Sequence, residues 1–234
     1  MIPRSLAVLV PAHDEEHLLP AALRAISSAA GHPALRQVRV VTVVVADDCA
    51  DDTAAVAVRE GAQVVRTGDS NVGRARSAAA HRALDILGGP QDVWLASTDA
   101  DSAVPPNWLA FQCARAREGW DAVVGTVTVT RSPCMTPGLE ALHRLRYAAS
   151  RPAHGHWHHP HVHGANLGVG AQAYLAAGGF PPVPLSEDHG LVSALAERGS
   201  RILRTADCPV FTSGRLRPRA RGGFGDHLAG LAEE

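Results

Sequence analysis

The chain has 234 residues, a formal net charge of −1 and a hydrophobic share of 46%, which is enough apolar material for one large domain. This charge balance argues against a general nucleic-acid surface and against bulk electrostatic attachment to a membrane. The sequence has no apolar run of about 18 residues, so no membrane-spanning helix is predicted. The N-terminal residues do not resemble a signal peptide. The four cysteines form no CxxC pair, so we expect reduced thiols and a cytoplasmic protein.

The first hundred residues alternate between patterns typical of strands and of helices. Continuous apolar runs predict buried strands, and apolar residues at helical spacing predict helices between them. Strands are expected at residues 6–10, 38–46, 63–66 and 92–96, and helices at 14–29, 51–60 and 72–87. This alternation predicts a parallel sheet with helices on both faces and ligands beyond the carboxyl ends of its strands. Acidic residues follow three of these ends, at 13–16, 47–48 and 99–101.

The second half of the chain is less regular. Helices are expected at residues 108–117, 139–150, 172–177, 187–198 and 226–232, and strands at 122–130, 164–169, 202–203 and 209–212. Residues 154–163 hold six of the 13 histidines. Since no internal repeat and no linker is evident, we expect a single domain over residues 1–234.

Asp99 and Asp101 are the most informative pair of residues in the chain. They follow a short apolar run, and side chains two positions apart in an extended segment point the same way. Two neighbouring carboxylates repel each other unless a cation lies between them, and a hard divalent cation that also binds phosphate is the usual partner. The pair therefore predicts a metal and phosphate site, with a turn or a helix cap as the alternative.

Two common classes of nucleotide-binding protein are excluded by the sequence. A dinucleotide-binding domain predicts G-x-G-x-x-G after the first strand, but residues 11–16 read Pro-Ala-His-Asp-Glu-Glu. A phosphate-binding P-loop requires a lysine, and this chain has none.

Short blocks along the chain match one family in the same order. The blocks are residues 8–16, 44–53, 71–76, 98–101, 178–180 and 186–188. Each is loose alone, but together they resemble a family-2 glycosyltransferase of the GT-A fold over nearly the whole chain. The resemblance implies a Rossmann-like, mostly parallel sheet flanked by helices, with a smaller acceptor-side subregion. It also implies a nucleotide-sugar-binding half at residues 1–104 and an acceptor-binding half at residues 105–234.

The resemblance implies that the first half holds the donor. Its first block matches a segment that holds the nucleoside, and Asp47 matches an aspartate that reads the edge of the base, which suits uracil. The donor-binding residues implied in this way are Pro11, Ala12, His13, Glu15, Asp47, Arg74, Arg76, Asp99, Ala100 and Asp101. A helix cap is the alternative for Asp47, and a solvated helix face is the alternative for Arg74 and Arg76.

The same resemblance implies a divalent cation, Mg²⁺ or Mn²⁺, at the DxD motif formed by Asp99 and Asp101. The cation offsets the charge that develops on the leaving diphosphate. Asp101 is the better candidate for a direct ligand. A late histidine is the third ligand in many such enzymes, and His189 and His227 are both candidates.

Glu187 and Asp188 match the acidic pair that precedes the acceptor-side helix of the family. An inverting transfer needs a carboxylate that takes the proton of the acceptor hydroxyl, so Asp188 is implied as the base, with Glu187 helping to orient the acceptor. The alternative is a helix N-terminus capped by Ser186, with two acids in its first turn.

The acceptor pocket is implied at a Gly-x-Asn block, where His163, Gly164 and Asn166 are the candidate acceptor-binding residues. The histidine-rich segment before it has spacings that suit zinc, but Gly155, Trp157 and Pro160 interrupt it and no cysteine accompanies it. A mobile loop over the acceptor or metal site is therefore favoured over a zinc site.

The function expected from these observations is metal-dependent transfer of a sugar from a UDP-linked donor to a small-molecule or lipid-presented hydroxyl acceptor. Inversion is expected, and the absence of a Gln-x-x-Arg-Trp motif favours a single, non-processive transfer. No nucleic-acid partner is expected, and a homodimer is left open. The alternating arginines at 215, 217, 219 and 221 are expected to cover the diphosphate or to form a solvated basic tail.

Two alternative functions remain at this point. A sugar-phosphate nucleotidyltransferase would have a Gly-rich basic loop after the first strand, where this chain is acidic. A non-catalytic nucleotide-binding or metal-binding module would tolerate the loss of Asp188.

Overall fold

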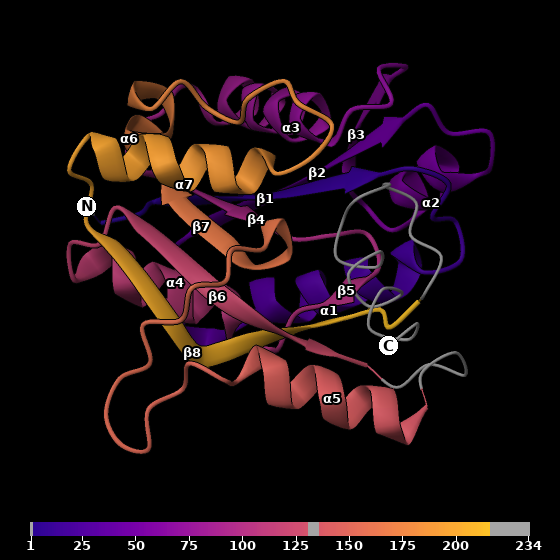
Figure 1. Ribbon diagram of the computed structural model, residues 1–234. Helices are drawn as coiled ribbons and strands as arrows, with labels where there is room; N and C mark the ends of the chain where they lie inside the picture. The colour runs from indigo at the N-terminus through magenta and orange to yellow at the C-terminus, as the bar shows by residue number, and fades with distance from the viewer. Residues whose placement is uncertain (1, 131–135, 216–234) are drawn as a thin grey trace.

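The computed structural model describes residues 2–130 and 136–215 (Figure 1). In this part of the chain one sheet has the strand order β3-β2-β1-β4-β7-β6-β8-β5. The strands are β1 (Ser5–Ala12), β2 (Arg39–Asp47), β3 (Gln63–Thr67), β4 (Val93–Ser97), β5 (Ser102–Ala103), β6 (Ala122–Val129), β7 (Leu167–Gly170) and β8 (Ile202–Thr212). The helices are α1 (Leu19–Ala30), α2 (Thr53–Arg59), α3 (Val72–Leu87), α4 (Trp108–Arg117), α5 (Pro137–Tyr147), α6 (Ala171–Ala176) and α7 (Glu187–Glu197), with 3₁₀ turns η1 (Pro33–Leu35) and η2 (Gly164–Asn166).

The first half of the chain forms the parallel part of the sheet, as its alternating pattern predicted. Strand β1 lies between β2 and β4 with parallel pairing on both sides, and β3 extends β2. These strands read as continuous apolar runs because helices cover both of their faces. Their carboxyl ends therefore lie at one edge of the sheet, which brings the acidic blocks after β1, β2 and β4 together.

The second half adds strands of mixed direction, in keeping with the mostly parallel sheet that the resemblance implies. Strand β7 is antiparallel to both β4 and β6, while β8 is parallel to β6 and antiparallel to the short β5. The two strands expected at 202–203 and 209–212 are one strand, β8. The strand expected at 164–169 begins as the turn η2, and only β7 is extended. The helix expected at 226–232 lies outside the described residues.

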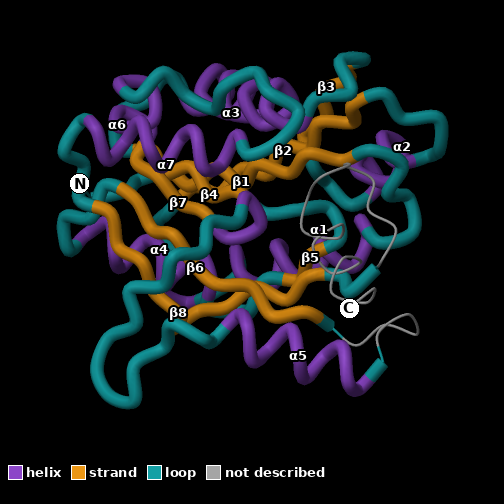
Figure 2. Tube along the Cα trace, viewed as in Figure 1, coloured by secondary structure: helices purple, strands orange, loops and turns teal. Residues whose placement is uncertain are grey.

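Two apolar layers cover the sheet (Figures 1 and 2). Helices α1, α2 and α4 pack on one face, where Ile26 and Trp108 are buried. Helices α3, α6 and α7 pack on the other face, where Tyr174 and Leu191 are buried beside the alanine-rich side of α3. No helix in the described residues is long and apolar enough to cross a lipid bilayer.

Helix α3 begins at a defined point next to the carboxyl edge of the sheet. The side chain of Asn71 caps it by accepting a hydrogen bond from the N–H of Arg74 at 2.9 Å. Gly88 ends it in the left-handed conformation, with a φ of 81°. These signals explain why the helix has the bounds expected from the sequence, and they fix where its first turn faces the cleft.

Candidate active site

A cleft of about 1010 Å³ opens at the carboxyl edge of the parallel strands. It is lined by most of the residues that the sequence predicted for the site: Pro11, Ala12, His13, Glu15, Asp47, Arg76, Asp99, Ala100, Asp101, His163, Gly164, Glu187, Asp188 and His189. Arg74 and Asn166 do not line it, and His227 lies outside the described residues. The structure thus brings the donor-side and acceptor-side blocks to one cavity.

Asp47, at the end of β2, organises the loop between β3 and α3. Its buried carboxylate accepts hydrogen bonds from the Thr67 hydroxyl and from the N–H groups of Asp69 and Asn71, each at 2.8 Å. These partners all precede α3, so Asp47 does not cap α2, the next helix along the chain. Its backbone carbonyl lies 2.8 Å from Nδ1 of His13, which joins the ends of β1 and β2.

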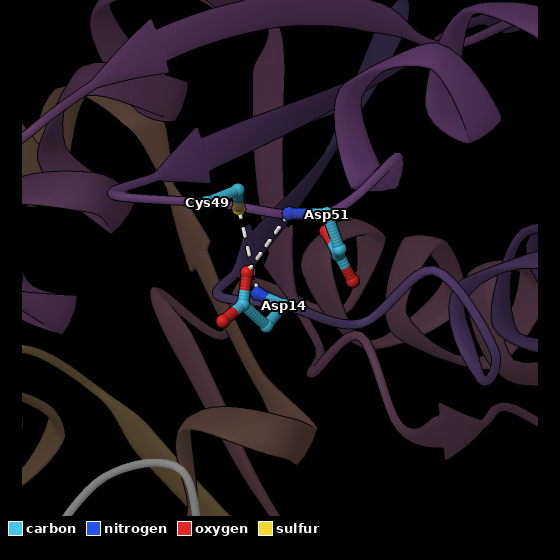
Figure 3. Close-up of side chains that lie close together, drawn as sticks. All are labelled: Asp14, Cys49 and Asp51. Atoms are coloured by element: carbon cyan, nitrogen blue, oxygen red, sulfur yellow. Dashed lines mark hydrogen bonds between the residues drawn. The ribbon is translucent and has the colours of Figure 1, made fainter.

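A second acidic group, not predicted from the sequence, lies beside this edge. The ligand atoms of Asp14, Cys49 and Asp51 lie within 4.8 Å of one another, a spacing compatible with a metal ion (Figure 3). Asp14 accepts hydrogen bonds from the N–H groups of Ala50 at 2.8 Å and Asp51 at 3.3 Å. Asp51 accepts the N–H of Thr53, the first residue of α2, at 2.9 Å. Burial raises the pKa of the Cys49 thiol.

Arg76 is buried beneath the cleft and joins its two sides. Its Nε donates to the Ser97 hydroxyl at 3.0 Å, and its two terminal nitrogens pair with Glu187 and Asp99. A solvated helix face is therefore the wrong interpretation for Arg76. It is the right one for Arg74, which is exposed and pairs with a surface acid.

The backbone of the acceptor side packs directly on this guanidinium. A Cβ atom on Gly164 would clash with the terminal nitrogens of Arg76, so any other residue there would require the buried guanidinium to shift. Burial opposes the charge on Arg76, but the carboxylates of Glu187 and Asp99 more than compensate and raise its pKa.

Asp99 and Asp101 each have an arginine partner. Burial raises the pKa of Asp99 to about 6; Arg76 opposes this shift and Asp101 adds to it. Asp101 accepts hydrogen bonds from Arg215 Nε at 3.1 Å and Nη2 at 2.7 Å, and Arg215 also pairs with Glu15.

Arg215 thus follows β8 and bridges the acids at the ends of two other strands. It is the member of the alternating arginine series that the structure describes. The arginines at 217, 219 and 221 lie outside the described residues.

The DxD pair fits a hard divalent cation. Its four oxygen atoms belong to the ligand class that Mg²⁺ and Mn²⁺ prefer, and both residues line the cleft. Arg215 pairs with one member of this pair, Asp101, and with the neighbouring Glu15, so this position attracts positive charge. His189, the candidate third ligand that the structure describes, is exposed and lines the same cleft.

Asp188 connects the start of α7 with the acceptor-side turn. Its Oδ2 accepts the N–H of Gly164 at 2.8 Å, and its Oδ1 accepts the N–H of His189 at 2.8 Å. Ser186 occupies the N-cap position of α7 and both acids lie in the first turn, as the alternative predicted, but the Ser186 side chain makes no capping hydrogen bond. The carboxylate is half-buried in the cleft wall, which leaves it accessible to a ligand.

Asn166 lies behind the cleft wall. Its Oδ1 accepts the indole N–H of Trp108 at 2.9 Å, and its Nδ2 donates to the carbonyls of Thr126 and Cys208, each at 2.9 Å. The side chain therefore ties η2 to α4, β6 and β8 and shapes the acceptor side from within.

The histidine-rich segment packs through its ring nitrogens. Nε2 of His159 bonds two strand carbonyls, in β6 and β8, at 3.1 Å, and Nε2 of His161 donates to the Tyr147 carbonyl at 2.7 Å. Within residues 2–130 and 136–215, no three histidines lie within metal-ligand spacing of one another.

The sequence did not point to the wall contributed by α5, where His143, Arg146 and Tyr147 line the cleft. The spacing of these residues is that of an ordinary amphipathic helix. The one signal that could have pointed to Tyr147 is the rarity of tyrosine, with two in the chain.

Comparisons with known proteins agree with this architecture. The family model described as glycosyl transferase family 2 matches residues 7–169. The search of curated proteins gave no match. TarS 1–349 from S. aureus, solved with UDP-GlcNAc, is similar at a TM-score of 0.67 and 15% identity; the match covers 94% of this chain and 61% of that one.

Two further structures are similar over almost the whole chain. Glucosyl-3-phosphoglycerate synthase from Mycobacterium tuberculosis, solved with Mn²⁺, UDP-glucose and phosphoglyceric acid, has a TM-score of 0.61 and 19% identity, over 97% of this chain and 78% of that one. A mycobacterial protein has a TM-score of 0.59 and 22% identity, over 98% and 73%. At these identities the likeness shows the fold. With the family match, it follows that the chain belongs to glycosyl transferase family 2 and has the GT-A fold.

Proposed function

We propose that this chain is a metal-dependent glycosyltransferase that moves a sugar from a UDP-linked donor to a hydroxyl acceptor, with inversion and in single transfers. One observation carries the proposal: the strand-end acids Asp99 and Asp101 and the helix-start acids Glu187 and Asp188 line one cleft. A cation-binding pair on one side and a carboxylate on the other are what a nucleophilic displacement at a sugar phosphate requires.

The donor side supports a nucleoside diphosphate. The loop that Asp47 holds lies at the end of β2, where the base of a nucleotide binds in such sheets. Within residues 2–130 and 136–215, Oδ2 of Asp47 accepts one hydrogen bond, from Asn71, and so has a second lone pair that suits the N3–H of uracil. The similar structures from S. aureus and M. tuberculosis bind UDP-linked sugars, which favours UDP here.

Asp101 and Asp99 would hold Mg²⁺ or Mn²⁺. The cation, when bound, supplies the positive charge that offsets charge developing on the departing diphosphate. Arg215 pairs with Asp101 and Glu15 at this position, and its guanidinium would suit the phosphate groups that accompany a cation.

The acceptor side supports Asp188 as the base. The N–H of Gly164 fixes one of its oxygens, so the carboxylate has a set direction in the cleft. Glu187 is committed to Arg76, so it acts by orienting this side of the site and leaves the proton to Asp188. A hydroxyl that attacks from this side displaces the diphosphate held on the opposite side, which inverts the anomeric centre.

The single domain, the cytoplasmic location, the homodimer and the identity of the acceptor stay predictions. The nucleotidyltransferase alternative gains no support, since residues 11–16 contribute Glu15 to an acidic wall in place of a basic phosphate loop.

Thermal unfolding with UDP and Mn²⁺ tests the donor assignment. Both together are expected to raise the melting temperature more than either alone, because a ligand that binds the folded state stabilises it by mass action. Asp101→Ala should remove the part that depends on Mn²⁺. Asp14→Ala is the matched control, since it disrupts the second acidic group (Figure 3). This variant should keep the rise in melting temperature that depends on Mn²⁺.

The result that overturns the donor assignment is a melting temperature that no nucleoside diphosphate shifts, with or without Mn²⁺. Transfer itself is measured as UDP release from UDP-glucose in the presence of a panel of hydroxyl compounds: glycerol, methyl glucoside and phosphoglyceric acid.

A further inference from the structure

The acceptor side of the cleft contains a short series of hydrogen bonds, of which the proposed function uses only the last. The N–H of Val127, in β6, donates to the hydroxyl oxygen of Tyr147 at 3.1 Å. That oxygen lies 3.0 Å from Nε2 of His163, at the other end of the histidine-rich segment. The next residue, Gly164, donates its N–H to Asp188 at 2.8 Å. The chain of hydrogen bonds therefore ends beside the peptide group that holds the candidate base.

The direction of the bond between Tyr147 and His163 follows from the number of hydrogens. A tyrosine hydroxyl has one hydrogen, and one of its lone pairs already accepts the N–H of Val127. Within the part of the chain that the structure describes, Nε2 of His163 is the only side-chain acceptor within hydrogen-bond distance of this hydroxyl. Burial raises the pKa of Tyr147 to about 12, so the hydroxyl keeps its hydrogen at neutral pH. If the O–H of Tyr147 donates to Nε2, both groups are satisfied, whereas an N–H at Nε2 would leave the hydroxyl hydrogen to the open cleft. The geometry therefore favours Nε2 as the acceptor.

The state of the imidazole follows from this direction. Burial and the neighbouring histidines lower the pKa of His163 to about 3, so its ring is neutral and has one N–H. Because Nε2 accepts, the hydrogen is on Nδ1.

The phenol ring that sets this state is itself held firmly. The ring of His161 stacks on that of Tyr147, with centroids 3.8 Å apart and planes 6° from parallel. The edge of Trp157 faces the same ring at 6.3 Å. The hydroxyl therefore has little freedom to turn away from Nε2.

We propose that Tyr147 is a positioning residue that fixes His163 in the tautomer protonated at Nδ1, so that His163 serves the acceptor as a hydrogen-bond donor while Asp188 takes the proton. The roles of His163 in binding the acceptor and of Asp188 in taking the proton rest on the proposed function. The tautomer of His163 does not depend on it. An imidazole whose Nε2 is occupied by a hydroxyl hydrogen cannot compete with Asp188 as a base through that nitrogen.

Nitrogen NMR of the whole chain labelled with ¹⁵N-histidine tests the tautomer. The signals of His163 are identified by their loss in His163→Gln. In the wild type, Nε2 should have the shift of an unprotonated nitrogen that accepts a hydrogen bond, and Nδ1 that of an N–H. Tyr147→Phe should move the Nε2 signal.

Tyr174→Phe is the matched control for this shift. It removes the other tyrosine hydroxyl, which is also buried and accepts a backbone N–H, from Phe180 at 3.2 Å. It should leave the His163 signals in place. A protonated Nε2 in the wild type, or signals unmoved by Tyr147→Phe, would overturn the proposal.

Kinetics test the division of labour, with the panel compound that gives the fastest UDP release. Tyr147→Phe should raise the KM for this acceptor about tenfold, the equivalent of one hydrogen bond, and change kcat little. His163→Asn places an amide N–H near the Nδ1 position and should bind the acceptor better than His163→Gln, whose amide reaches the Nε2 position.

Equal losses in the two His163 variants, or a lower kcat with an unchanged KM in Tyr147→Phe, would overturn this part. If no panel compound supports UDP release, the proposed transfer fails for these acceptors, and the NMR result still decides the tautomer.

Discussion

The donor side and the acceptor side of the cleft place their functional groups by different means. On the donor side, Asp47 and Asp99 follow parallel strands, so the direction of the strands alone brings them to one edge. On the acceptor side, Asp188 and Gly164 come from a helix start and a 3₁₀ turn and are held by hydrogen bonds between distant residues. On the donor side, the parallel order of the strands is enough to bring the functional side chains together. On the acceptor side, their positions depend on specific hydrogen bonds that single substitutions can break.

The largest expected effect comes from a change confined to the acceptor side. Asp188→Asn should lower transfer by about 10²–10⁴-fold, the usual contribution of a general base, while UDP and Mn²⁺ bind as before. The asparagine keeps an oxygen that accepts the N–H of Gly164, so the turn is preserved. UDP release and UDP affinity are measured on the same protein. Near-normal transfer would rule out Asp188 as the base.

The next effect tests the residue that joins the two sides. Arg76→Met leaves Glu187 and Asp99 without their buried partner and should lower the free energy of unfolding by about 3–5 kcal/mol. Arg74→Met is a matched control two positions earlier in the same helix, where an exposed pair with Asp69 contributes about 1 kcal/mol or less. Chemical denaturation measures both. Similar losses in the two variants would show that the bridge is not what holds the sides together.

A smaller effect is expected at Arg215, a residue of the acceptor half that pairs with Asp101 and Glu15 on the donor side. Arg215→Ala should raise the affinity for Mn²⁺ in the absence of nucleotide by up to about fivefold, because Asp101 and Glu15 lose a competing cation. Calorimetric titration with Mn²⁺ measures this, and Arg201→Ala, at an exposed position, is the control. Weaker binding of Mn²⁺ in Arg215→Ala would show that the arginine assists the cation.

The smallest effect is a pH dependence at Asp99. Its pKa is raised from 3.8 to about 6, so the folded state binds this proton more tightly than the unfolded state does. The stability that results is complete at acidic pH and is lost as the pH rises through about 6. The advantage of the wild type over Asp99→Asn in free energy of unfolding should therefore shrink over this window. Denaturation in metal-free buffer checks it, and a pH-independent difference would contradict it.

Much of the donor side could be predicted from the sequence because its signals are local. Helix α3 has the expected bounds, since apolar spacing and end signals lie within the segment. The acids after β1, β2 and β4 were predicted to meet because strand alternation implies parallel pairing, and the cleft contains them.

The acceptor side could be predicted only in part because its contacts are long-range. The partner of Arg76 in α7 is 111 residues away, and no local pattern indicates a pair at such a separation. The direction of β7 depends on pairing with both β4 and β6, which a short apolar run does not specify. Asn166 lies in the block matched to an acceptor pocket, but its three hydrogen bonds with Trp108, Thr126 and Cys208 turn it inward.

Gly164 has a consequence for anyone who wishes to redesign the acceptor preference. Because Gly164 has no side chain, the guanidinium of Arg76 packs against its backbone, and its N–H donates a hydrogen bond to Asp188. A substitution there would therefore disturb both the cleft wall and the candidate base. A library that randomises it would select against folding before it could select for a new acceptor. Diversity is better introduced at positions of α5 such as His143 and Arg146, which line the cleft without holding the base.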